Sequence, residues 1–546
     1  GDHGLQRTSM ASSKERPDKA KIGVDYAVMI GIVAIILMTG RQYVPSEFFD
    51  VTSKQQDVAS DGTGSVPAGD TVNRPSIAVL PFTGLGTEGS DFRKGLTIEL
   101  ISVLAQTGMF QMPGINSSFQ FEDSAVDPRE IGETLHVEYL VEGVVRENGN
   151  KIRIEANLIR ASDGFLIWSN TYDAGKTDLF ETQEEIGLAI GAALATPLKI
   201  EAKELEAQRT ENPEAYEDFL KSLPLLAQRG ESLLEAEKLL LHAVDLAPDF
   251  AAAWAALSLA YERIPNHLDE INGRPIRPNL LYRKSKQAAL RAQELAPTQP
   301  IVRLAVGNMY LRDLQWEAAE TQFRSTVAKD PFYVPVVLPY TALLYSVGKF
   351  REAEELAARY VYLDPLNDFQ IFNNVFINEY VKSGRTNVDG FSDLFLKNAS
   401  LRQMTLRIFL DNFSLRGDVE SVLPLVEACE SCTEALLYEV SELVADVGRL
   451  PPEDLYSKYR DHGFFGYGLA FSVGGADMAL RLFEYDAEDV GSRQKLFTVP
   501  WNIISEVGSN PEFVRIAEEI GLMKYWKLMG WPEGCEPTDD GGFVCT

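Results

Sequence analysis

Prolines at a fixed spacing constrain this chain more than any other feature of its sequence. Pro297, Pro331 and Pro365 each end a helical run, and successive members lie 34 residues apart. Pro248 precedes Pro297 by 49 residues, and the additional stretch is visible as the polar insertion "RIPNHLDEINGRPIRPN". A period of this length is typical of repeats built from one helix pair, which buries its apolar face against the next pair. The spacing therefore predicts a curved array of helix pairs.

The residue types within the period indicate the kind of repeat. The copy that ends at Pro331 resembles a tetratricopeptide repeat, because small and aromatic residues occupy the positions where the two helices meet. These residues are Gly307, Tyr310, Ala319 and Phe323, and Ala236 and Ala353 repeat the small residue in other copies. We expect tetratricopeptide (TPR) repeats over 201–370 and degenerate helical repeats over 371–520.

An uncharged segment near the amino end, "YAVMIGIVAIILMTG" at 26–40, is with its flanks long enough to cross a bilayer. Basic residues precede it and an acidic stretch follows it, so the positive-inside rule places the amino end in the cytoplasm. A secretory signal peptide and a buried core helix are the rival interpretations. We expect a tail at 1–23 (a tag or the start of a fragment), one transmembrane helix at 24–44 and a flexible linker at 45–74. The expected location is the bacterial inner membrane, single-pass, with the bulk periplasmic.

An α/β domain is predicted over 75–200. Ile77 to Phe82 is a continuous apolar run typical of a covered strand, and helical spacing follows from Leu96. Residues 110–113 are a candidate second strand. Alternating runs at 137–143, 152–158 and 165–172, separated by turn residues, then predict three antiparallel strands. The fold class is therefore a single transmembrane helix, a mixed-sheet α/β domain and an all-α TPR solenoid.

The first strand leads into Gly84-x-Gly86-x-x-Gly89, the spacing of a dinucleotide-binding loop. Such a site also needs an acidic residue at the end of the second strand and a second βα unit. This sequence has neither, so we interpret the loop as a surface turn. No cofactor is predicted.

The residues from Ser76 to Leu194 resemble the TolB-like amino-terminal domain of membrane-tethered bacterial regulators and adenylate cyclases. The similar stretches are "RPSIAVLPF", "KGLTIELISVLA", "DPREIGETLHVEYLVEGVVRENGNKIRIEANLIRASDGFLIWSNTYD". The resemblance implies a non-catalytic module that usually precedes tetratricopeptide repeats. Its relatives often have a winged-helix or nucleotide-cyclase domain before the membrane span.

The cysteines form two close pairs, Cys429 with Cys432 and Cys535 with Cys545. A redox pair would need a thioredoxin-like context, and a zinc site would need a second pair at closer spacing. Two local disulfides are the simpler interpretation. The tail "YWKLMGWPEGC…FVC" resembles the ending of this group of repeat proteins and predicts a Trp/Cys cap at 521–546. The histidines are isolated, so no metal site and no catalytic residue are predicted.

The net charge of −29 argues against nucleic acid as a partner of this chain, because phosphates must be neutralised by Lys and Arg. The first helix of each pair lines the concave face of such arrays, and cations and donors gather at its expected positions. These residues are Lys221, Arg229, Asn308, Arg312 and Tyr345. They predict a groove for an acidic segment or a free carboxylate.

We therefore expect a non-enzyme. The first hypothesis is a membrane-anchored scaffold or sensory module of the bacterial envelope, which binds a protein or peptide partner, a membrane protein complex included. The alternative is the periplasmic sensor fragment of a membrane-bound transcription regulator or nucleotide cyclase whose effector domain is absent. A soluble enzyme would need a ligand in the α/β domain.

Overall fold

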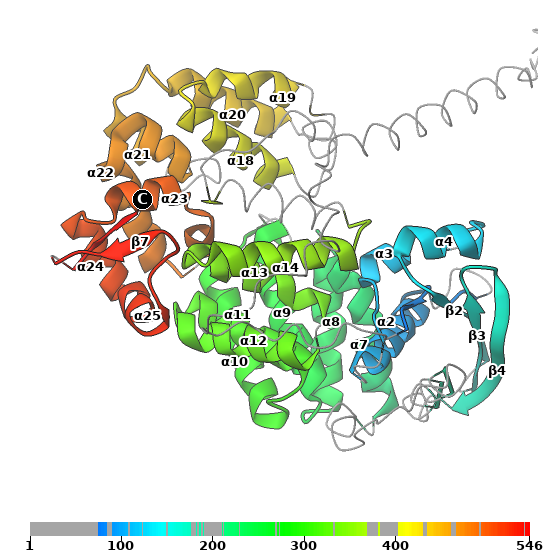
Figure 1. Cartoon of the computed structure of the whole chain (residues 1–546). Helices are drawn as coiled ribbons and strands as arrows, with labels where there is room; N and C mark the ends of the chain where they lie inside the picture. The colour runs from blue at the N-terminus through cyan, green and yellow to red at the C-terminus, as the bar shows by residue number, and fades with distance from the viewer. Residues whose placement is uncertain are drawn as a thin grey trace, which may run out of the picture. The chain divides into compact units, whose positions relative to one another are not determined.

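The computed structural model describes most of residues 75–545 (Figure 1). Outside its description lie residues 1–74, 85–89, 176–181, 191–209, 368–380, 383–401 and 460–465, together with shorter stretches and the last residue. The chain divides into Gly1–Val72 and Asn73–Thr546, and all described residues belong to the second part.

The predicted membrane topology requires a correction. The expected span at 24–44 lies outside the described residues, as do the tail and the linker around it. Within the described residues, no helix is both long and apolar enough to cross a bilayer. The longest of them, α22 (Tyr467–Glu488), has several charged side chains in its second half. The supported fold class is a mixed-sheet α/β domain followed by a helical region, and the single-pass, inner-membrane location is not retained.

The α/β domain is built on a four-stranded sheet in the order β1-β2-β3-β4. β1 (Ile77–Val79) runs parallel to β2 (Tyr139–Asn148), and β2, β3 (Lys151–Arg160) and β4 (Phe165–Gly175) form an antiparallel meander. The meander is the one that the alternating sequence predicts. The candidate second strand at 110–113 is reduced to a single parallel bridge between Ser76 and Gln111.

Helices cover both faces of this sheet (Figure 1). On one face α2 (Ser90–Gln106) buries Leu96, Leu100 and Leu104 against the inward residues of β1 to β3. On the other face α4 (Pro128–Leu135) buries Ile131 and Leu135. The sequence starts α4 locally, because the Asp127 side chain accepts a hydrogen bond from the Arg129 N–H and Pro128 occupies the first helical position.

Successive antiparallel pairs of helices follow the α/β domain. Each pair ends two residues before one of the four periodic prolines, because the residue preceding a proline is disfavoured in the α conformation. The pairs are α7 (Pro213–Ala227) with α8 (Ser232–Leu246), α9 (Ala251–His267) with α10 (Pro278–Leu295), α11 (Pro300–Arg312) with α12 (Trp316–Lys329), and α13 (Val337–Ser346) with α14 (Phe350–Leu363). The insertion between α9 and α10 contains the short strands β5 (Glu270–Ile271) and β6 (Arg274–Pro275).

The small residues of the period lie where two helices approach closely. A Cβ atom at Gly307 of α11 would lie 2.4 Å from the Phe323 ring of α12, which is less than a carbon–carbon contact allows. Ala236, Ala319 and Ala353 are fully buried at the equivalent helix contacts. These positions therefore exclude larger side chains for steric reasons.

Two contacts join the α/β domain to the helix pairs. At the first, α2 packs on α7 so closely that a Cβ at Gly95 would lie 1.9 Å from the Leu220 carbonyl oxygen. At the second, α3 (Ile115–Phe119) meets the end of α14. The buried carboxylate of Asp364 accepts hydrogen bonds there from the Ser117 N–H (2.8 Å) and the Ser117 hydroxyl (2.6 Å).

The rest of the described chain is helical and ends in a short hairpin. Its elements are α18 (Arg402–Leu415), α19 (Leu423–Glu427), α20 (Glu434–Asp446), α21 (Pro452–Tyr459), α22, α23 (Trp501–Val507), α24 (Pro511–Glu519), α25 (Leu522–Met529), β7 (Cys535–Pro537) and β8 (Phe543–Cys545). The 3-10 helices η3 (Val334–Val336), η5 (Val419–Val422) and η6 (Arg493–Thr498) lie between them.

The carboxy-terminal segment packs on the last two helix pairs. The indole N–H of Trp501 donates to the Tyr345 carbonyl, and that of Trp526 donates to the Val347 carbonyl (3.0 Å), both at the end of α13. In the opposite direction, the Trp316 indole of α12 donates to the Ile520 carbonyl (2.8 Å). Such exchanged bonds satisfy carbonyls at helix ends that would otherwise be buried without a donor.

The Asp364 contact allows a direct test. Asp364→Ala should lower the free energy of unfolding by about 3 kcal/mol, because Ser117 and Tyr360 lose a buried charged acceptor. Guanidinium denaturation, with hydrogen exchange of residues 115–119, would measure this loss. Asp477→Ala, at an exposed position of α22, is the matched control. Equal denaturation midpoints for the two variants would contradict the assigned role of Asp364.

Candidate functional site

The glycine loop is described only in part. After β1, Thr83 forms an isolated parallel bridge with Val144, and its N–H donates to the Gly143 carbonyl at 2.9 Å. A Cβ at Gly84 would lie 2.8 Å from both Arg93 Cδ and the Val145 oxygen, so close packing on β2 explains this glycine. Gly86 and Gly89 lie outside the described residues.

The five residues predicted to line a concave groove have different environments. Lys221 forms an ion pair with Glu217 on its own helix at 2.7 Å. Arg229 lies outside the described residues. Tyr345 is 3% exposed and lies beneath the carboxy-terminal segment. Only Asn308 and Arg312, both on α11, come together in one site.

That site is the inner-face cluster, which we define as Glu262 and Arg263 of α9 with Asn308 and Arg312 of α11. The Asn308 amide donates to Glu262 Oε2 at 2.8 Å. The guanidinium of Arg312 lies over the Tyr282 ring, 5.9 Å from its centroid. The Arg263 side chain donates to the Leu226 carbonyl, which ends α7. The cluster therefore links the first helices of successive pairs.

Burial dominates the electrostatics of the inner-face cluster. It raises the pKa of Glu262 to about 7, although Arg312, Asn308 and Arg263 act in the opposite direction. The same burial lowers the pKa values of Arg263 and Arg312. Glu262 Oε1 and Asn308 Oδ1 are both shielded from solvent, and neither accepts a hydrogen bond from the described residues. One acid thus lies beside the predicted Arg312 and the unpredicted Arg263, so the cluster is not uniformly cationic.

A second buried acid lies on the α/β domain. Glu99 of α2 is 8% exposed, and burial raises its pKa to about 7. Tyr333, between α12 and α13, has its pKa raised by burial first and then by the nearby Asp330 and Glu99, while Arg263 opposes this. Glu99 therefore lies close enough to influence the helix pairs electrostatically. Helix α2 occupies part of the face that the sequence predicts to be an open groove.

Sequence reasoning missed Glu262 and Arg263. Both residues lie in the repeat that ends at Pro297. The insertion lengthens this repeat, so its first residue cannot be found by counting a fixed number of residues back from Pro297. Subtracting the 49-residue interval from Arg312 gives Arg263, so the intervals between the prolines contain the signal. If the insertion is assumed to lie between the two helices of that repeat, the same count identifies Arg263 from the sequence.

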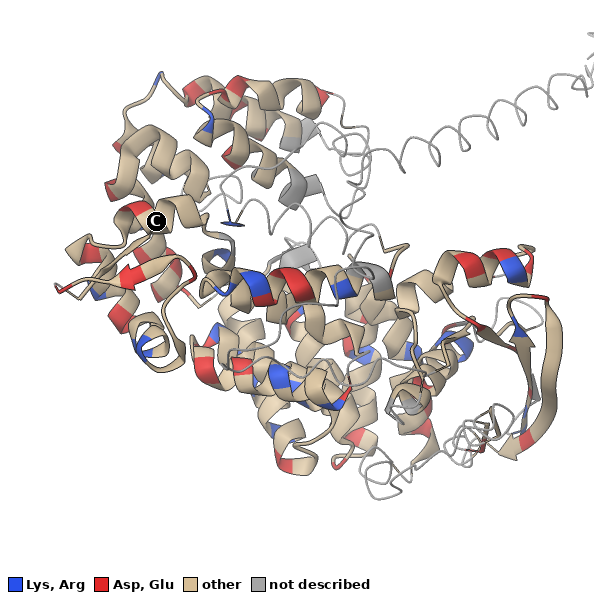
Figure 2. Ribbon diagram, viewed as in Figure 1, with Lys and Arg blue, Asp and Glu red and all other residues tan. Residues whose placement is uncertain are grey.

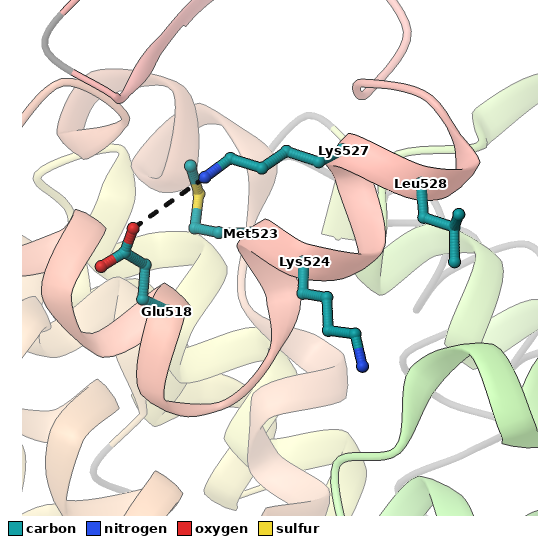
Figure 3. A pocket seen from close by; sticks show the side chains of 5 residues that line it. All are labelled: Glu518, Met523, Lys524, Lys527 and Leu528. Carbon is teal, nitrogen blue, oxygen red and sulfur yellow. Dashed lines mark ion pairs between the residues drawn. The ribbon is translucent and has the colours of Figure 1, made fainter.

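The surface of the carboxy-terminal segment has a shallow hollow of about 410 Å³ (Figure 3). Leu528, which is 58% exposed, contributes apolar surface, and the buried Met523 lies at the base of the hollow. Lys524 and Lys527 also line it. The ion pair between Lys527 Nζ and Glu518 Oε1 is long, at 4.0 Å. Lys524 makes no ion pair within the part of the chain that the structure describes. The hollow therefore combines apolar surface with an unneutralised positive charge.

The cysteines have no metal-binding geometry in the described residues, where no group of three or more His, Cys, Asp or Glu side chains could hold an ion. Cys535 and Cys545 form the expected disulfide between β7 and β8. Cys429 is also disulfide-bonded, while Cys432 lies outside the described residues.

The comparisons with known proteins concern parts of the chain. A family model described as HilA/YgeH-like transcriptional regulator, second domain, matches residues 73–187. A protein of Rhizobium meliloti (strain 1021) named "Putative adenylate cyclase 3" is 32% identical over 214 residues, which are 38% of this chain and 36% of that protein. The chain thus spans about a third of the length of this curated relative. These similarities relate the chain to regulators and cyclases.

Among solved structures, the lipoprotein GNA1162 of Neisseria meningitidis is 17% identical, with a TM-score of 0.17. The match covers 22% of this chain and 94% of that protein. This score is too low to indicate a shared fold.

The pKa of Glu262 predicts a pH dependence of stability. Between the ordinary value of 4.5 and about 7, the folded chain holds a proton that the unfolded chain releases, so this contribution to stability falls as pH rises. The amide introduced by Glu262→Gln cannot ionise, so the free energy of unfolding of this variant should lack this fall. From about pH 5 to about pH 8, the difference in stability between the variant and the unmodified chain should therefore shift by about 1–3 kcal/mol in favour of the variant. Denaturation midpoints at the two pH values would measure it. Glu488→Gln, on the exposed end of α22, should show no such gain, and a pH-independent difference for Glu262→Gln would disprove the assignment.

Proposed function

We propose that this chain is a non-catalytic, partner-binding module of a regulator- or cyclase-related signalling protein. The two named relatives are assigned different outputs, one a transcriptional regulator and the other a cyclase. Similarity of one chain to proteins of different output is best explained by a regulatory or binding task common to both. This shared similarity is the observation on which the proposal rests.

The proposal includes an assignment of the two folded parts. The α/β domain is a TolB-like module, supported by its quoted motifs and by its four-stranded mixed sheet. The helices from α7 to α14 are tetratricopeptide repeats, supported by the 34-residue period, by helix ends before each periodic proline and by the Gly307–Phe323 contact. Both are protein-binding architectures when they occur without catalytic groups.

For the binding surface we favour the hollow on α25 over the inner-face cluster. The unpaired acceptors of the cluster are shielded from solvent, and helix α2 packs on α7, the first helix of the neighbouring pair. The hollow is open and combines the exposed Leu528 with two lysines in a chain whose net charge is −29. A protein segment with one apolar side chain beside a carboxylate would satisfy both the apolar surface and Lys524.

The absence of catalysis can be tested directly. The purified chain, incubated with ATP and Mg²⁺ or Mn²⁺, should form no cyclic AMP above a protein-free blank, because the residues it shares with the cyclase relative are only about a third of that protein. Liquid chromatography with mass spectrometry would quantify the product, and an active nucleotide cyclase would serve as positive control. Cyclic AMP that increases with the amount of this chain would refute a non-catalytic module.

The binding surface predicts a charge-specific effect. Lys524→Glu combined with Lys527→Glu should reduce partner capture at least tenfold, about 1.4 kcal/mol, because the two introduced glutamates would repel the carboxylate of the partner. Cross-linking and quantitative mass spectrometry of proteins bound to the full chain would measure capture.

The matched control for this double variant is Lys238→Glu with Arg283→Glu. It produces the same change of charge at exposed positions of α8 and α10. Equal capture by the two double variants would show that the hollow is not the binding surface. Loss of capture in both would indicate a general effect of net charge and would also contradict the proposal.

A further inference from the structure

Strand β4 forms one edge of the four-stranded sheet and pairs with β3 alone within the described residues (Figure 1). It is 11 residues long, which is as long as any other strand described. Its middle residues, Ser169, Asn170 and Thr171, are exposed. An edge strand of this length presents a row of backbone N–H and C=O groups that can pair with another strand.

The middle of β4 lacks the usual protection of an edge. Proteins commonly place lysine, proline or inward-pointing charges on such strands. β4 has neither lysine nor proline, and Figure 2 shows most of it in tan. Its one charged residue, Asp173, is held by Arg153 of β3 through two bonds of 2.6 and 2.9 Å. A bulge where Leu158 and Ile159 face β4 interrupts the regular pairing at the amino end of the strand, so the regular part begins at Trp168.

The residues from Trp168 to Tyr172 are arranged symmetrically about Asn170. Trp168, Asn170 and Tyr172 oppose Leu158, Ala156 and Ile154 of β3, so they lie on the face of the sheet that packs on α2. The two aromatic rings lean toward each other, with centroids 6.5 Å apart. Ser169 and Thr171 lie on the opposite face and oppose Asn157 and Glu155.

We propose that two copies of this chain associate through β4, antiparallel and centred on Asn170, to form one continuous sheet across both copies. In this register Asn170 opposes its own copy, Trp168 opposes Tyr172 of the second copy, and Ser169 opposes Thr171 of the second copy. Aromatic pairs and hydroxyl pairs directly opposite each other stabilise antiparallel strands. A twofold axis requires this self-complementarity, since both copies use the same surface.

Charge also favours a second copy of this chain as the occupant. The carboxylate of Asp173 would oppose Ile167, so no charged residue of β4 would face a like charge across the axis. Pairing of the backbone would in turn satisfy those N–H and C=O groups of the central residues that β3 does not use. The Thr171 N–H, which donates to the Asn170 side-chain oxygen at 2.9 Å, would exchange that bond for one across the axis.

The axis residue provides a specific test. Asn170→Lys places two ammonium groups directly opposite each other, and like charges in that position destabilise strand pairing. Sedimentation velocity of the full chain over about 1–100 µM should show a dimer for the unmodified chain and at least a tenfold weaker one for Asn170→Lys. Asn170→Glu should be equally weak alone, whereas an equimolar mixture of the two variants should dimerise because Lys then opposes Glu. Circular dichroism melting would establish that both variants are folded, as expected at an exposed position.

The matched control is Asn502→Lys, the same substitution at an exposed position of α23. It should dimerise like the unmodified chain. The proposal is overturned by an unmodified chain that stays monomeric, by a dimer that survives Asn170→Lys, or by loss of the dimer in Asn502→Lys. It is likewise overturned if mixing the Lys and Glu variants restores no dimer, because the self-opposed register would then be incorrect.

Discussion

The buried carboxylate of Asp364 joins the two folded parts of this chain. It lies immediately before Pro365, the last of the periodic prolines, where the backbone must leave the helical conformation. Its two oxygens bind Ser117 of α3 on one side and Tyr360 and Asn367 of its own segment on the other. One position therefore both ends a helix and attaches the α/β domain to it.

The residue before the periodic proline differs between the repeats. Ala247 and Ala296 precede the first two prolines and are buried small residues, whereas Asp330 and Asp364 precede the last two. Both acids are almost fully buried, at 3% and 0% exposure. A buried acid is unfavourable unless it is hydrogen-bonded, so each needs partners from outside its own helix pair. The change from alanine to aspartate thus coincides with the part of the array that meets other elements.

Another buried acid, Glu320, joins the helix pairs to the carboxy-terminal segment. Glu320 of α12 is 1% exposed and binds Lys349 (2.8 Å), Arg324 and the Tyr525 hydroxyl of α25. Two cations and a phenol outweigh the burial of the carboxylate, so its pKa is lowered rather than raised as at Glu262 and Glu99. The contrast distinguishes Glu320, which forms direct ion pairs, from Glu262, where the nearby guanidinium groups do not outweigh burial.

The sequence predicted those features whose cause is local. Helix ends follow from Pro248, Pro297, Pro331 and Pro365, and the meander follows from its alternation and turn residues, because each depends on neighbours in the chain. The surroundings of Arg312 could not be predicted in this way. Its acidic neighbour Glu262 lies on the other side of an insertion, and α2 reaches the helix pairs from a different domain. Packing between distant segments therefore decided which predicted residues share a site.

The two edges of the sheet differ in how far another strand could pair with them. The β1 edge is occupied in part, because the Ile77 N–H donates to the Gln111 carbonyl and the Gln111 N–H donates to the Pro75 carbonyl. Helix α2 packs on one face of the sheet and α4 packs on the other face against β2, and α2 in turn packs on α7. Within the described residues, strand pairing to the α/β domain is thus directed to β4. Recognition of side chains, in contrast, falls to exposed helix surfaces such as α25, where Lys524 adjoins apolar surface. The proposed backbone pairing and the proposed side-chain recognition therefore concern separate surfaces, so we expect a mutation on one to leave the other unchanged.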